Sequence, residues 1–172
     1  MVDAAIAKAG TTLRLQYRFE ATPERVFHAW TQPEALRRWW CPAGWLPAEI
    51  AVDFRVGGGY RLSMVRERGV HLVTVEGRFL EIHPVHKLVY TWRWDGAFPD
   101  LPETRITVEF LPAPGGTDLM LRQEALPLPV CVRHVTGWLD AFARIERLTG
   151  KPYARGLAST LHADQIAAGH PA

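Results

Sequence analysis

The residues best suited to chemistry in this sequence are large aromatic side chains with a few polar groups among them. Seven of the 172 residues are Trp, a side chain that usually lines cores, pockets or interfaces. Strand alternation and helical spacing predict that many of these groups face one concave surface, suited to a flat or hydrophobic ligand. The candidate ligand-binding residues are Trp40, Tyr60, Met64, Trp92, Trp94, Gln123, His134, Trp138 and Phe142.

A densely packed core explains the same aromatic pattern equally well, because most aromatic residues at regular spacing are core residues. His134 lies four residues before Trp138, so the two can share a helical face. His134 either contacts the ligand pocket or is an ordinary helix histidine, which is hydrogen-bonded within the protein or exposed to solvent. Gln123 can form hydrogen bonds but cannot titrate near neutral pH, which weakens any mechanism that needs a general base there.

Other polar residues favour structural roles. His83 and His86 flank a predicted turn without a third ligand nearby in the sequence, so we expect surface histidines and no metal site. Asp53 and Arg55 precede three glycines, and we expect them to pair with cross-strand neighbours. A strand follows these glycines, which therefore indicate a bulge or tight turn and not a phosphate cradle. Solvated charge is the expectation for Glu76, Glu81, Glu109 and Glu124.

Composition limits the class of protein. Hydrophobic residues make up 48% and charged residues 22%, as in an ordinary globular domain. The net charge of +2 is too small to indicate nucleic-acid binding, and no apolar run approaches the roughly 20 residues of a membrane span. Cys41 and Cys131 lie far apart, which is typical of a reduced cytoplasmic protein, although a disulfide between them stays open. Nucleophile-elbow and nucleotide-binding motifs are absent from the sequence, so we expect no cofactor.

Strands and helices must position the candidate residues. Period-2 alternation predicts strands at residues 13–20, 50–55, 60–65, 72–82, 88–95, 105–110 and 119–124. Thr-Pro-Glu at residues 22–24 and Thr-Gln-Pro-Glu at 31–34 indicate two short helices, and residues 130–148 form a long amphipathic pattern. We predict an α+β domain at residues 11–150, with an N-terminal extension at 1–10 and a tail at 151–172. A curved antiparallel sheet of about seven strands should wrap the long helix.

Six short segments occur in an ordered set that is more specific than any one of them. They are residues 21–27 with Trp30 and Thr31, residues 33–42, 53–60, 77–82 and 88–92, and Gly137 with Trp138. Over residues 13–149 the set resembles the SRPBCC superfamily, which is START-like and birch-pollen-allergen-like. Within it, the match is to the group named after the activator of the heat-shock-protein-90 ATPase.

The resemblance implies a helix-grip fold with a deep cavity between the sheet and the C-terminal helix. Related proteins bind lipids, sterols, polyketides or plant hormones there, and some are cyclases or aromatases. Many members carry His on the last strand, where this sequence has Gln123. We therefore predict a cytoplasmic domain that binds a small hydrophobic or aromatic molecule.

Two other functions stay open. A polyketide cyclase or aromatase would use Tyr60, Gln123 or His134 to orient or protonate its substrate. A chaperone ATPase-activator-like module would instead bind a protein partner through an exposed apolar patch. The oligomeric state is also open, and a spare edge strand or aromatic surface would support a homodimer.

Overall fold

The computed structural model describes residues 11–66, 71–95, 98 and 100–150, and its elements follow the predicted order. The predicted extension at 1–10 and tail at 151–172 lie outside these residues. The strands are β1 (Thr11–Phe19), β2 (Trp45–Val52), β3 (Gly59–Arg66), β4 (Leu72–His83), β5 (Lys87–Asp95), β6 (Thr104–Ala113) and β7 (Gly116–Leu126). The helices are α2 (Pro23–Thr31), α3 (Pro33–Trp39) and α4 (Leu128–Thr149).

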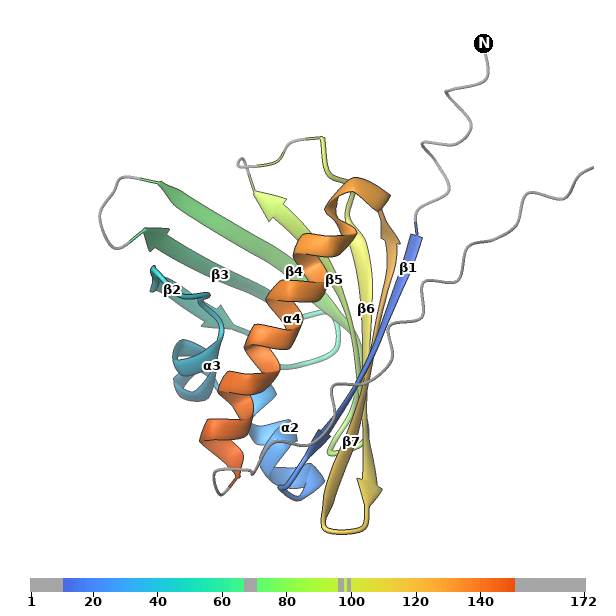
Figure 1. The fold of residues 1–172 in the computed structure, drawn as a ribbon. Coiled ribbons are helices and arrows are strands. Elements are labelled where there is room, and N and C mark those ends of the chain that lie inside the picture. The colour runs from blue at the N-terminus through green and yellow to red at the C-terminus, as the bar shows by residue number, and fades with distance from the viewer. Residues whose placement is uncertain (1–10, 67–70, 96–97, 99, 151–172) are drawn as a thin grey trace, which may run out of the picture.

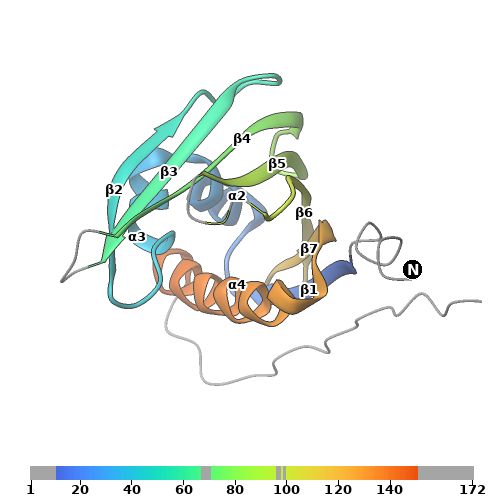
Figure 2. The same ribbon diagram turned by 90° about the horizontal axis from the view of Figure 1, so that it is seen from above.

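The seven strands form one antiparallel sheet in the order β1-β7-β6-β5-β4-β3-β2. From β2 to β7 each strand pairs with the next along the chain, and β1 adds to the sheet beside β7. The sheet curls around α4, which crosses its concave face (Figures 1 and 2). The short helices α2 and α3 lie toward the C-terminal end of α4 (Figure 1). The predicted helix-grip fold is thereby confirmed.

Prolines define where the helices begin. The residue directly before the second helix, α3, is Gln32. Thr31 is the last residue of α2, and its buried hydroxyl donates a hydrogen bond to the backbone carbonyl of Phe27 in that helix. Pro33 takes the first position of α3, where a missing backbone N–H costs nothing. The helix α4 starts at Leu128, before the predicted start at residue 130, because Pro129 is tolerated in the first turn for the same reason.

The edge strand β2 differs from the prediction. It runs from Trp45 to Val52, whereas the sequence alternation predicts residues 50–55. The strand is the last in the sheet, so it tolerates Pro47, after which the pairing register shifts. Asp53 and Arg55 lie beyond its end and pair with each other at 2.9 Å, which corrects the expected cross-strand pairing.

Trp30 on α2 is the centre of the packed part of the interior. Its ring centroid lies 5.1–6.2 Å from four other aromatic rings. These rings belong to Trp39, Phe110, Trp138 and Phe142. Its indole N–H also donates to the hydroxyl of Tyr90 at 3.3 Å. One side chain therefore connects α2 to α3, α4, β5 and β6.

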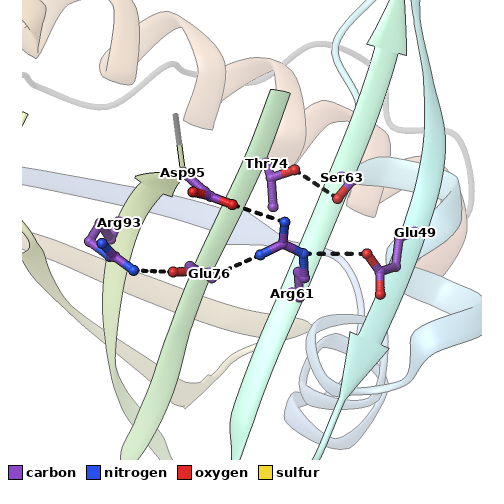
Figure 3. A network of polar contacts seen from close by, with 7 residues as sticks. All are labelled: Glu49, Arg61, Ser63, Thr74, Glu76, Arg93 and Asp95. Atoms are coloured by element: carbon purple, nitrogen blue, oxygen red, sulfur yellow. Dashed lines mark hydrogen bonds and ion pairs between the residues drawn. The ribbon is translucent and has the colours of Figure 1, made fainter. Parts of the chain in front are cut away.

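Charged residues cover the outer face of the strands near the β2 edge. Arg61 contacts Glu49 (3.4 Å), Glu76 (2.7 Å) and Asp95 (2.9 Å), and Glu76 also pairs with Arg93 (Figure 3). These ion pairs join β2, β3, β4 and β5 on the side opposite to α4. Because the arginines are exposed to solvent, each pair contributes little stability. Glu76 is thus occupied as an ion-pair partner on the wet face.

Gly77 on β4 lies opposite Tyr60 on β3, whose hydroxyl donates to the carbonyl of Thr91 at 2.6 Å. A Cβ at residue 77 would collide with that same carbonyl oxygen and lie 2.8 Å from the Tyr60 hydroxyl. We predict that Gly77→Ala lowers the free energy of unfolding by about 1–3 kcal/mol, measured by urea denaturation. Gly137→Ala is the control: its Cβ meets open space, and it should raise the free energy by about 0.5–1 kcal/mol. Equal stability of Gly77→Ala and wild type would contradict this packing.

Candidate functional site

A cavity of about 300 Å³ lies between the sheet and α4. Its walls come from the end of α3 and the turn after it, from strands β2 to β5, from the segment after β5, and from one face of α4. Met64 and Val73 contribute from neighbouring positions of β3 and β4, which pair with each other. Most of the lining residues are apolar. The volume of the cavity is at the lower end of the range for typical ligand pockets.

Tryptophan dominates the cavity wall. The six that line it are Trp39, Trp40, Trp45, Trp92, Trp94 and Trp138. The ring of Trp92 on β5 lies 5.1 Å from that of Trp40, just after α3, and 5.5 Å from that of Trp138 on α4, so the three rings form a continuous surface. The indole N–H groups of Trp40 and Trp92 are buried without a hydrogen-bond partner in the part of the chain that the structure describes. Unsatisfied buried donors are rare in native interiors.

One face of α4 closes the cavity. Its lining residues recur every three or four positions, as expected for one side of a helix. They are Val130, Arg133, His134, Gly137, Trp138, Ala141 and Arg144. Arg144 also donates from its guanidinium to the backbone carbonyl of Trp39 at 2.8 Å, which ties the helix to the end of α3. Only His134 and Trp138 of this face are among the candidates from the sequence, and the helical period of the segment is the signal that indicates the other five.

Gln123 on β7 is the centre of the polar contact between sheet and helix. Its side chain is completely buried. Its amide nitrogen donates to the hydroxyl of Thr104 at 2.9 Å. Its Oε1 lies 3.1 Å from the indole nitrogen of Trp138 and 3.1 Å from Nδ1 of His134. Both helix residues therefore meet the same buried oxygen.

His134 lies between this polar contact and the cavity. Its ring packs edge-on against Trp92 and Trp94, with centroid distances of 6.4 and 6.2 Å. Burial and, to a smaller extent, the nearby Arg133 guanidinium lower the pKa of His134 to about 4. The imidazole is therefore neutral near pH 7.

Six of the nine candidate residues line the cavity, and their role in ligand binding stays a prediction. These are Trp40, Met64, Trp92, Trp94, His134 and Trp138. Gln123 lies behind the wall, Tyr60 points its hydroxyl at the Thr91 carbonyl, and Phe142 is fully buried in the packed part. Alternation indicates which face a side chain occupies, but it does not indicate whether that part of the face is packed or hollow.

The titratable residues at the β4–β5 turn form surface ion pairs. His83 lies 3.5 Å from the Glu81 carboxylate, and both side chains are exposed. The hydrogen bond from Lys87 to Glu81, at 2.8 Å, is the main cause that lowers the pKa of that carboxyl. Among the described residues, no group of three or more His, Cys, Asp or Glu side chains could hold a metal ion. None of the helices described there is long and apolar enough to cross a membrane.

A curved antiparallel sheet that grips a long helix around an aromatic cavity defines a domain of the SRPBCC class. More specifically, the chain belongs to the family described as Activator of Hsp90 ATPase homolog 1-like protein, whose model matches residues 20–150. This finding confirms the superfamily resemblance of the sequence. Among curated proteins, none is similar enough to count as a match.

Solved structures share the fold. A protein from Chromobacterium violaceum is 30% identical, with a TM-score of 0.75 over 82% of this chain and 98% of that one. A protein from Rhodobacter sphaeroides is 26% identical, with a TM-score of 0.70 over 80% of this chain and 91% of that one. The AHSA1-like protein from Aeromonas hydrophila is 22% identical, with a TM-score of 0.67 over 80% and 90% of the two chains, and this similarity supports the fold alone.

The low pKa of His134 predicts a pH-dependent loss of stability. The unfolded chain binds a proton near pH 6.5 and the folded chain only near pH 4, so this stability is complete above pH 6.5 and is lost as the pH falls toward 4. Between pH 7.5 and pH 5 the wild type should lose roughly 1–2 kcal/mol more free energy of unfolding than His134→Gln. Urea denaturation at both pH values measures the difference. Equal losses in the two proteins would show that His134 titrates as an ordinary histidine.

Proposed function

We propose that this domain binds a small, flat, apolar molecule in the cavity between the sheet and α4. The observation that carries the proposal is the wall itself, in which six of the seven tryptophans surround about 300 Å³ of space. Aromatic walls with few polar groups are typical of sites for small organic ligands. The size favours a ligand of about two fused rings.

The difference between the two ends of the interior supports a binding role over a packed core. The other end of the same interior, around Trp30, holds only about 40 Å³ of space between close aromatic rings, so the chain is able to fill most of its interior with aromatic side chains. A hollow lined by aromatic rings beside a filled region is consistent with a site kept open for a ligand.

The charges around the cavity limit the ligand further. Arg133 and Arg144 belong to the lining, and among the described residues that line it there is no acidic side chain. A neutral or anionic molecule is therefore favoured over a cation. The cyclase or aromatase function and the chaperone-partner function remain predictions from the family resemblance. We also propose a cytoplasmic location, which is supported by Cys41 and Cys131, both free thiols.

Gly137 offers a direct test, because it lines the cavity and a Cβ added there meets open space. A Leu side chain at this position leans toward the N-terminus of α4, over the turn that carries His134. We predict that Gly137→Leu weakens the binding of 2-methoxynaphthalene by about tenfold or more, measured by isothermal titration calorimetry. The reason is that the new side chain occupies the space of the ligand.

The matched control is Gly137→Ala, which makes the same gain in helix propensity but fills little space. It should bind 2-methoxynaphthalene within about twofold of the wild type. Both variants should unfold at higher urea concentration than the wild type, which shows that the fold is intact. Unchanged binding to Gly137→Leu, or no binding to the wild type, would contradict the proposed function.

A further inference from the structure

We infer that the ligand of this cavity carries a hydrogen-bond donor on its flat ring system, such as an aromatic hydroxyl, and donates it to Nε2 of His134. The inference rests on the proposed function, because it assigns a chemical group to the ligand of the same cavity. It follows from the direction of every hydrogen bond around Gln123.

The indole of Trp138 determines how the Gln123 amide is oriented. An indole N–H can only donate, so the Gln123 atom 3.1 Å from it must be the carbonyl oxygen. The amide nitrogen then faces Thr104 and donates to its hydroxyl at 2.9 Å. The Thr104 hydroxyl in turn donates to the backbone carbonyl of Trp92 at 3.3 Å. Each donor in this chain of hydrogen bonds therefore faces an acceptor.

The same oxygen determines the tautomer of His134. A carbonyl oxygen can only accept, so Nδ1 of His134, 3.1 Å away, must carry a proton. A neutral imidazole has one N–H, and its other nitrogen is then an acceptor with a free lone pair. Burial keeps the ring neutral, since it lowers the pKa of His134 to about 4. Nε2 is therefore an acceptor.

No other side chain described in the wall competes with this acceptor. Among the described residues that line the cavity, His134 is the only one whose side chain offers a nitrogen or oxygen acceptor, since the others are apolar, Trp or Arg. No hydrogen bond to its Nε2 occurs within the described part of the chain. A ligand donor that reaches Nε2 replaces the water lost on binding, whereas a ligand without one buries the lone pair unpaired.

The test compares 2-naphthol with 2-methoxynaphthalene, which has the same rings but no donor, by calorimetry on the full chain at pH 7. Naphthalene controls for the size of the methoxy group. The wild type should prefer 2-naphthol over both by about tenfold, the effect of one well-made hydrogen bond. In His134→Phe the preference should fall below about twofold while binding of 2-methoxynaphthalene persists. Thr136→Ala, on the exposed face of α4, should keep the preference.

A second measurement needs no substitution. Long-range ¹H–¹⁵N NMR of the wild type at pH 7 should show Nδ1 of His134 protonated and Nε2 unprotonated, and 2-naphthol should shift the Nε2 resonance. A proton on Nε2 would overturn the inference even if His134→Phe does not fold. Equal affinity for the three probes would overturn it and leave the proposed function standing. Binding of none of them would overturn both.

Discussion

The hydrogen bonds to the buried Gln123 oxygen determine where α4 lies on the sheet. The indole of Trp138 and the imidazole of His134 reach the same atom from successive turns of the helix. Breaking this contact would leave buried polar groups unpaired, so the helix can neither slide nor rotate without a large cost. The face of α4 that is turned toward the cavity, and the acceptor that His134 presents there, both depend on this contact.

The interior is largely filled by side chains on one side of this contact and hollow on the other. Around Trp30, rings from α2, α3 and α4 fill the space between the sheet and the helix. On the side of strands β2 to β5, the sheet and the helix are separated by the tryptophan-lined cavity. The outer ion pairs of Arg61 lie on these same strands, so the charged side chains remain on the opposite face (Figure 3). The family relation accounts for this architecture, whereas the ligand must be inferred from the wall.

Local sequence patterns predict the fold well, because alternation, proline positions and helical spacing are local properties. The same patterns place Tyr60 and Trp92 on one inner face, yet Tyr60 is used for packing and Trp92 lines the cavity. That difference depends on how far the sheet stands from α4 at each point, which only the tertiary structure determines. The limits of β2 also depend on tertiary structure, since an edge strand tolerates Pro47 where a central strand does not. The proton on His134 also cannot be predicted from sequence, because it follows from contacts between residues on different elements.

We propose the space between the sheet and α4 as a binding site for a small apolar molecule. The measurement that tests it most directly is a crystal structure of the full chain soaked with 2-bromonaphthalene, in which anomalous scattering locates the bromine. We expect one strong bromine peak inside the cavity, among the rings of Trp40, Trp92 and Trp138. A cavity filled by the protein's own side chains, with no bromine peak in it, would contradict the account.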